Sequence, residues 1–192
     1  MDKKRLVLLG ILLVLLIALV IIFFRSGGEE RIEKPPATPP PEPGSVPTEL
    51  PETKKVLLFF LSENDTLLHP EEREIFAGSS IVHQAKQTIE ELINGSQSGY
   101  VSPFPPETKV RELFVTEQGI AYVDFSREIL EKHPAGSSAE ISTIFSIVNS
   151  LTYNFKSINR VFILIEGGEK ETLGGHINLS RAFRPQYDII AK

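Results

Sequence analysis

Apolar side chains are distributed along the chain in three different ways. Residues 6–24 form an unbroken apolar run of 19 residues, residues 25–54 contain few large apolar side chains, and residues 55–188 alternate short apolar runs with polar turns. As a helix that rises about 1.5 Å per residue, the first run can cross the roughly 30 Å hydrocarbon layer of a bilayer. The pattern therefore predicts a transmembrane helix, a spacer and one folded domain.

The charges that flank the apolar run indicate its orientation. Residues 3–5 are basic, whereas Arg25 is followed by the acidic pair Glu29 and Glu30. The positive-inside rule places residues 1–5 in the cytoplasm and the rest of the chain outside. A cleaved signal peptide is the alternative, but its apolar region usually has about 7–15 residues. The length favours an uncleaved signal anchor at residues 6–24, with the lipid bilayer as its partner.

Residues 25–54 have the composition of a linker. They include the stretch KPPATPPPEPGSVPTELPETK, which is rich in Pro, Glu and Thr. Such a segment cannot bury enough apolar surface to form a core, and its prolines favour extended polyproline II conformations. We therefore expect a disordered, Pro-rich spacer that holds the following domain away from the membrane.

Short apolar runs predict the strands of the domain. VLLFFL at 56–61 and VFILI at 161–165 have the length and composition of buried strands, and we expect them to be neighbours in one sheet. KVRELFVT at 109–116 and IAYVDF at 120–125 flank a three-residue connection that contains Gly119, which predicts an antiparallel hairpin. The sheet is therefore expected to be mixed.

Two segments have the 3.6-residue period of amphipathic helices. Residues 79–96 have apolar positions at helical spacing, with serines before them and Gly95 after them. The second helix is predicted to begin with a capping box formed by Ser137 and Glu140. Its apolar stripe comprises Ile141, Ile144, Phe145, Val148, Leu151 and Phe155. The predicted fold is an α+β, two-layer sandwich of a mixed β-sheet and two main helices.

Composition narrows the chemistry that the domain can perform. The formal charge of −5 does not fit a basic nucleic-acid surface, and the absence of Cys excludes disulfides, thiolate zinc sites, cysteine nucleophiles and a lipid-modified N-terminal Cys. The four histidines lack the spacing of usual zinc sites, and no serine lies in a G-x-S-x-G motif. We expect no metal, no cofactor and no catalytic residue.

Several polar residues remain candidates for an interaction patch. Asp124 and Glu166 lie at the ends of predicted strands, and Asn149 and Thr152 lie on the second predicted helix. The other two candidates are Arg73 and His176. Structural roles are the simpler expectation for some of them. Asp124 or Ser126 can cap the helical turn expected at residues 127–132, and Asn149 can bond the backbone of a loop.

Residues 56–183 resemble a GerMN domain, the sporulation and spore-germination module of extracytoplasmic bacterial proteins. The similarity is carried, in order, by VLLFFLSENDTLLHPEEREI, AKQTIEELINGS, PPETKV, GIAYVDFSREI and IVNSLTYNFKSINRVFILIEGG. The chain departs from the family pattern at Ser96, where many members have Pro, at Glu107, where they have Gly, and at Ser150, where they have Thr. It carries one copy of the domain, whereas the namesake protein is similar to a tandem pair.

The resemblance implies a non-enzymatic domain that acts through protein contacts in the bacterial envelope, without a cofactor. Our first hypothesis is a single-pass protein of the bacterial cytoplasmic (inner) membrane whose outer domain binds an envelope protein or a second copy of itself. The second hypothesis is a module that binds a small envelope ligand such as a cell-wall fragment. A hydrolase is the third, and no nucleophile–base pair supports it. Self-association could use residues 109–116 as an edge strand, although Lys109, Arg111 and Glu112 would limit nonspecific pairing.

Overall fold

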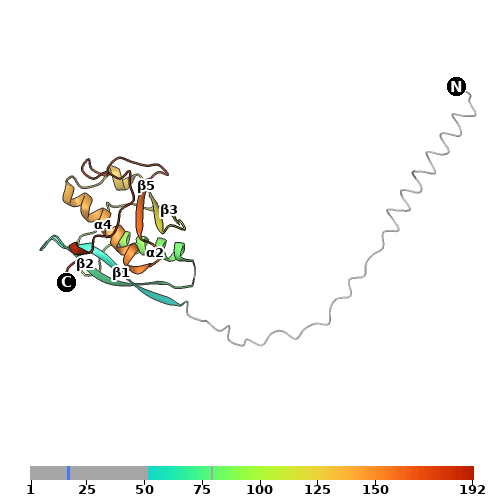
Figure 1. The fold of residues 1–192 in the computed structure, drawn as a ribbon, viewed down its shortest axis with the longest axis horizontal. Coiled ribbons are helices and arrows are strands. Elements are labelled where there is room, and N and C mark those ends of the chain that lie inside the picture. The colour runs from blue at the N-terminus through green and yellow to red at the C-terminus, as the bar shows by residue number, and fades with distance from the viewer. Residues whose placement is uncertain (1–16, 18–51, 79) are drawn as a thin grey trace, which may run out of the picture. The chain divides into compact units, whose positions relative to one another are not determined.

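The computed structural model describes residue 17, residues 52–78 and residues 80–192 (Figure 1). The predicted membrane helix at 6–24 and the predicted spacer at 25–54 lie outside the described residues, except for Ile17 and residues 52–54. Within the described segments, no helix combines the length and hydropathy that a membrane crossing requires. The account below concerns the compact unit Glu49–Lys192.

The described residues of this unit form five strands and three helices, followed by one short 3-10 helix. In chain order they are β1 (Thr53–Leu61), β2 (Leu68–Phe76), α2 (Ile81–Asn94), β3 (Val110–Val115), β4 (Ile120–Phe125), α3 (Glu128–Glu131), α4 (Ser137–Asn154), β5 (Arg160–Ile165) and η1 (Tyr187–Ile189). The α+β class, the 120–125 hairpin strand and the two main helices agree with the prediction.

The strands form two sheets. β1 and β2 make an antiparallel hairpin, and β3, β4 and β5 make a second sheet in that order, with β3–β4 antiparallel and β4–β5 parallel. The second sheet is mixed, as expected. The prediction that residues 56–61 and 161–165 are neighbours in one sheet is wrong, because the two runs belong to different sheets.

Helix α4 contacts β1 along the edge that a further strand would otherwise occupy. The N–H of Leu57 donates to Asn154 Oδ1 (2.9 Å), and Asn154 Nδ2 donates to the Leu57 carbonyl (2.7 Å). Two residues further along β1, the N–H of Phe59 donates to Ser150 Oγ (3.1 Å). Two side chains of α4, one helical turn apart, thus bond the backbone groups of alternate β1 residues. These backbone groups are therefore satisfied without a strand on the edge opposite β2.

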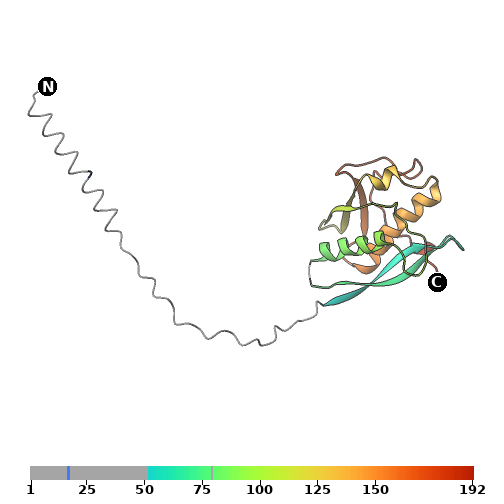
Figure 2. The ribbon, with the colours of Figure 1, turned by 180° about the vertical axis from the view of Figure 1, so that it is seen from behind.

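The two helices contact strands of both sheets. α2 packs against β1, β2 and β3, and α4 packs against β1 and β5. Figures 1 and 2 show α2 and α4 between the β1–β2 hairpin and the β3–β4–β5 sheet. The arrangement therefore differs from the predicted two-layer sandwich, in which one sheet was covered by helices.

α2 begins and ends where the sequence predicts. Ser80 is its N-cap, and the Ser80 hydroxyl accepts a hydrogen bond from the N–H of His83 (3.3 Å). At the other end Gly95 has a φ of 87°, and its N–H bonds the Leu92 carbonyl. Its buried positions include Ala85 and Ile89, as the apolar spacing indicated.

α4 is buried over a wider face than its predicted stripe. Within that stripe Ile144, Val148, Leu151 and Phe155 are buried, Phe145 is half-buried and Ile141 is exposed. The wider buried face adds Ser142, Thr143, Ser146, Ile147, Asn149, Ser150 and Thr152. Small hydroxyl side chains suit a helix with neighbours on several sides, because they allow close approach and can bond the carbonyl one turn earlier.

The predicted capping box is wrong. The N-cap of α4 is Gly136, which has a φ of 115° and makes no side-chain cap bond. Glu140 is fully buried, and its carboxylate binds a loop near the C-terminus instead of the first turn of its own helix. The Glu140 carboxylate thus bonds a loop that is distant in sequence, and not the N-terminus of α4 as the local motif predicted.

Candidate functional site

The six candidate residues lie in four separate places in the fold. Arg73 is on β2 beside the end of α2, and Asp124 and Glu166 lie together at the ends of β4 and β5. His176 contacts the first turn of α4, and the last pair, Asn149 and Thr152, contacts the C-terminal segment.

Arg73 forms part of a buried ion pair. It is 7% exposed, and its Nη1 donates to Oε1 of Glu71, which is on the same face of β2 and 8% exposed. Arg73 Nη2 also donates to the carbonyl of Gly95 (2.8 Å), the residue that ends α2, and Nε lies 3.6 Å from Glu91 Oε2. Arg73 therefore joins the β2 strand to the C-terminus of α2.

The Glu71 carboxylate holds the loop that follows α2. It accepts hydrogen bonds from Ser96 Oγ (2.6 Å), the N–H of Gln97 (3.0 Å) and the N–H of Ser98 (3.0 Å). Burial by itself would raise the pKa of Glu71, but the bonds from Gln97, Ser96, Ser98 and Arg73 outweigh it and lower the pKa to about 2. Glu71 is thus ionised and saturated with donors from its own chain.

Asp124 and Glu166 share Arg111, which comes from the bulged start of β3. Arg111 Nη1 lies 3.2 Å from Asp124 Oδ2 and 3.8 Å from Glu166 Oε2. Asp124 Oδ1 accepts from the N–H of Gly167 (2.8 Å), and Glu166 Oε1 accepts from the N–H of Arg127 (3.0 Å). These bonds fix the turns after β4 and β5.

The expected capping of the helical turn at 127–132 is wrong. α3 has Arg127 as its N-cap with no side-chain cap bond. Ser126 Oγ accepts from the N–H of Lys109 instead (3.0 Å), across the start of the hairpin, while Asp124 binds the turn after β5. Both side chains bind distant backbone groups and leave the start of α3 uncapped by a side chain.

His176 is bound to the buried Glu140. Glu140 Oε1 accepts from the backbone N–H of His176 (2.9 Å) and lies 2.8 Å from its Nδ1, and Oε2 accepts from the N–H of Ile177 (3.0 Å). Burial opposes ionisation of Glu140, but the bonds from Ile177, His176 and the N–H of Gly174 lower its pKa. A Cβ at Gly174 would lie 3.0 Å from Glu140 Oε1, so the loop approaches the carboxylate closely.

Asn149 and Thr152 attach the C-terminal segment to α4. Asn149 Nδ2 donates to the carbonyl of Gln186, and the N–H of Gln186 donates back to Asn149 Oδ1, both at 2.9 Å. This agrees with the loop anchoring expected for Asn149. The hydroxyl of Tyr187 donates to Thr152 Oγ1 (3.1 Å), so the two helix residues hold consecutive residues of the tail.

Two pockets lie on the part of the domain that the structure describes, and neither joins the four places. A pocket of about 480 Å³ lies between α2 and the end of β2, and its lining residues are Thr53, Glu74, Ile75, Phe76, His83, Gln87, Glu90 and Glu91. A pocket of about 320 Å³ on the other side of Glu90 is lined by Glu90, Ile93, Asn94, Thr108, Lys109 and Val110. None of the six candidates lines either pocket. Within residues 52–78 and 80–192, no group of three His, Cys, Asp or Glu side chains could hold a metal ion.

Sequence reasoning missed the two carboxylates that organise the loops, Glu71 and Glu140. The signal for Glu71 was its period of two with Arg73 and Ile75, which places all three on one face of a strand. Glu140 was assigned to a capping box, and no local signal pointed to its actual partner, because the loop that it binds is more than 30 residues away along the chain. Arg111, which joins two of the candidates, was noted for its edge position but not for this pairing.

A family model described as "Germane: Sporulation and spore germination" matches residues 57–171. The matched region runs from β1 to the loop after β5, so it covers both sheets and both main helices. No functionally curated protein matches the chain.

Two solved structures are similar in fold. A Clostridium perfringens protein described as a candidate lipoprotein is 24% identical, with a TM-score of 0.50; the match covers 69% of this chain and 87% of that one. The tandem GerMN domains of the sporulation protein GerM from Bacillus subtilis are also 24% identical, with a TM-score of 0.53 and 69% of this chain covered. The match covers 46% of that tandem structure, which is less than half its length.

Proposed function

Because the chain belongs to the sporulation and spore germination family of GerMN-type domains, we propose that it is a non-catalytic assembly module of the bacterial cell envelope. In this proposal the domain binds an envelope protein or a second copy of the chain. The observation that carries it is the dispersal of the buried polar side chains, each of which holds a different loop of the fold.

The dispersal of these polar side chains argues against catalysis, because catalytic groups must lie close to one another. A nucleophile, a base and a charge-stabilising group must lie within hydrogen-bond distance of one reacting position. Here Glu71 is buried within β2 and Glu140 in the first turn of α4, and each is occupied by backbone and side-chain donors. Carboxylates with lowered pKa values that are fully bonded stabilise structure and are poor acids at neutral pH.

We also propose the topology that the sequence indicates. Residues 1–5 would be cytoplasmic, residues 6–24 would anchor the chain in the inner membrane, residues 25–54 would act as spacer, and residues 55–188 would form the extracytoplasmic domain. Support comes from the apolar run and its basic flank. The similarity to a candidate lipoprotein is compatible with an envelope protein, although the Cys-free chain would need a different anchor.

The binding of a small envelope ligand is the weaker alternative. It would need Arg73, Asp124, Glu166 and His176 in one cleft, and these side chains belong to separate clusters except for the Asp124–Glu166 pair. We therefore favour macromolecular contact over ligand binding.

Photo-cross-linking of the full-length chain in its membrane tests the proposal. A photoreactive phenylalanine analogue would replace one exposed aromatic residue at a time, at Phe76, Phe114 or Tyr153, because these side chains are 49–54% exposed. We expect ultraviolet light to attach a reproducible envelope protein, or a second copy, at one or more of these positions.

The control combines each analogue with Val148→Asp, which places a charge in the core and should unfold the domain. Attachment that depends on the fold would disappear in this variant. If the folded, abundant protein attaches to no protein at any of the positions, the assembly function is wrong, and cell-wall fragments become the next ligands to titrate.

A further inference from the structure

The outer edge of β3 differs from the other strand edges of the domain. On β1, side chains of α4 bond the free backbone groups, as described above. On β5, Val161 exchanges two backbone hydrogen bonds with Phe183 (2.9 and 2.7 Å). On β3, Lys86 Nζ donates to the carbonyl of Arg111 (3.0 Å) at the bulged start of the strand. Among the described residues, no comparable bond is recorded for the outer edge from Glu112 to Val115.

The hydrogen-bond pattern shows which backbone groups of β3 point away from β4. The N–H of Thr116 donates to the carbonyl of Ile120 (3.0 Å), so these two residues form a hydrogen-bonded pair. Hydrogen-bonded and non-hydrogen-bonded pairs alternate in an antiparallel ladder. Phe114 is therefore bonded to β4, whereas the N–H and C=O groups of Leu113 and Val115 point to the open edge.

A row of aromatic rings crosses the outer face of the same sheet and ends at this edge. Phe114, Tyr122 and Phe162 occupy paired positions on β3, β4 and β5. The Phe114 and Tyr122 rings stack with centroids 4.8 Å apart, and the Tyr122 and Phe162 rings stack at 5.2 Å. Phe162 is 9% exposed and Phe114 is 49% exposed, so the last ring of the row has an open face at the edge of the sheet.

We propose that a second copy of this chain pairs with β3 across a two-fold axis centred on Phe114. The inference rests on the proposed assembly function and specifies its partner. Leu113 would pair with the partner's Val115, and Val115 with the partner's Leu113, so that each pair exchanges two backbone hydrogen bonds. Phe114 would lie opposite the partner's Phe114 and join the two aromatic rows into one. A two-fold edge pairing also closes on itself and cannot grow into a fibre along this edge.

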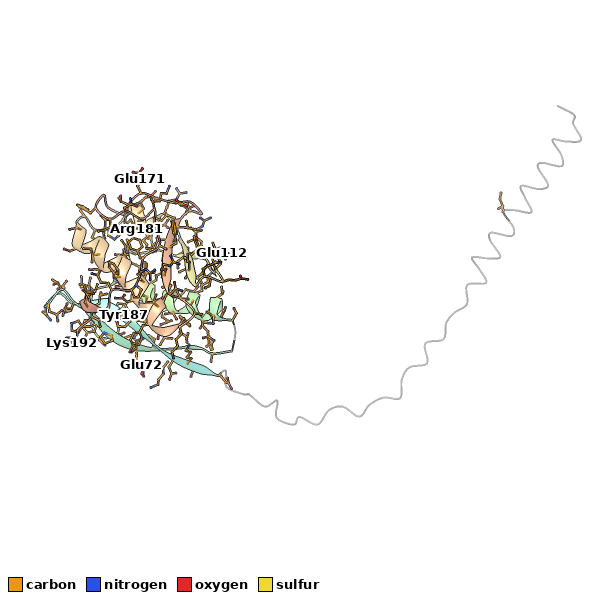
Figure 3. The ribbon with its side chains drawn as sticks, in the orientation of Figure 1. Glu72, Glu112, Glu171, Arg181, Tyr187 and Lys192 are labelled. Atoms are coloured by element: carbon orange, nitrogen blue, oxygen red, sulfur yellow. The ribbon has the colours of Figure 1, made fainter. Side chains whose placement is uncertain are left out.

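The charges on β3 select this register over its neighbours. An axis at Phe114 places Glu112 opposite the partner's Thr116, which is neutral. An axis at Glu112 would place two carboxylates opposite each other, which is destabilising. An axis at Leu113 or at Val115 would place Phe114 opposite Glu112 or Thr116 and would interrupt the aromatic row. Figure 3 shows the Glu112 side chain at the outside of the domain.

The absence of cysteine makes a single-cysteine test clean. In the proposed dimer the two Phe114 positions form a non-hydrogen-bonded pair with Cα atoms about 4.5 Å apart. That distance lies within the range of a disulfide. The matched control is Glu112→Cys, on the same face of the same strand, because the two copies of position 112 would be offset by four residues, or about 13 Å.

The experiment uses the full-length chain in membranes, treated with copper–phenanthroline and analysed on a non-reducing gel. We expect Phe114→Cys to shift the band to twice the monomer mass, and neither Glu112→Cys nor Phe76→Cys to do so. Phe76 is a second control because it is an equally exposed strand aromatic on the other sheet. As a further check, co-expression of Glu112→Cys with Thr116→Cys should give a dimer that neither variant gives alone.

Each contrary result has a defined meaning. Equal dimer from all three single variants would show random collision and overturn the pairing, as would no dimer from Phe114→Cys in a protein that melts like the unmodified chain. If that failure accompanies photo-attachment of another envelope protein, the two-fold pairing is wrong and the assembly function stands. If nothing attaches in either experiment, the assembly function fails as well.

Discussion

Replacement of Glu71 by Gln tests whether one buried carboxylate holds the loop after α2. The glutamine has nearly the same shape, so the core keeps its volume while the charge disappears. Arg73 then loses its buried ionic partner, and the donors of Ser96, Gln97 and Ser98 face a neutral amide. Loss of one partner from a buried ion pair is costly because it leaves the other charge uncompensated.

The pKa of Glu71 gives the size of the effect. The pKa falls from 4.5 to about 2 in the fold. This difference corresponds to about 3 kcal/mol between the two states. Allowing for partial screening by solvent at the rim of the cluster, we expect Glu71→Gln to lower the free energy of unfolding by about 2–3 kcal/mol at pH 7.

The pH dependence has a definite sign. Because the folded pKa lies below the unfolded value, the stabilisation is fully present above about pH 5 and is lost as the pH falls toward 2. The difference in stability between the unmodified domain and Glu71→Gln should therefore be largest at neutral pH and should shrink between pH 5 and pH 2.

Urea unfolding of residues 49–192 at a series of pH values measures this difference. The control is Glu72→Gln, because Glu72 lies next to Glu71 on β2, is 55% exposed and pairs with exposed Lys55. Figure 3 shows the Glu72 side chain at the outer surface of the hairpin. We expect no measurable change from the control. A loss below 1 kcal/mol at pH 7 for Glu71→Gln, or a loss that does not vary with pH, would refute the argument.

Three further predictions concern the core, a strained turn and the covered strand edge. Val148→Asp puts an unpaired charge at a fully buried position and should abolish the cooperative unfolding transition; a folded variant with unchanged melting would contradict the packing of α4. Glu107 has a φ of 68°, so Glu107→Gly should raise stability by up to about 1 kcal/mol in urea titrations, and a lower midpoint would contradict this. Asn154→Ala removes both bonds to Leu57 and should cost about 2 kcal/mol while accelerating hydrogen exchange at the Leu57 amide; unchanged exchange would show that the strand edge does not depend on the helix.

The elements with a clear hydrophobic period were predictable from the sequence. β1 and β5 each contain a continuous apolar run, and α2 has both its apolar spacing and its end signals in the local sequence. β2 was not assigned as a strand from its own pattern, because two of its inward positions carry Glu71 and Arg73. When charged residues occupy the inward positions of a strand, its sequence shows no alternation of apolar and polar residues.

The pairing of strands was not predictable from local sequence. It depends on which strand or side chain, distant in sequence, bonds the free edge of each strand. β1 and β5 have the same local character, yet side chains of α4 occupy the free edge of β1 and exclude a further strand. The same limit applies to the candidate residues. Sequence reasoning selected six polar residues as candidates, but it could not show that they bind different loops.

Two groups of residues in this domain are expected to have different roles. The buried polar residues hold the fold, and the residues at the open edge of β3 bind a partner. Glu71, Glu140 and Asn149 are each less than 9% exposed, and each is bonded to the backbone of a loop. Changes at these positions should therefore act through stability. Phe114 is half exposed on β3, so its replacement by Cys should leave the fold intact and act through association. Variants of the first group should change the unfolding midpoint, whereas variants of the second group should change association. A variant that changes association without changing the unfolding midpoint would therefore locate the binding surface directly.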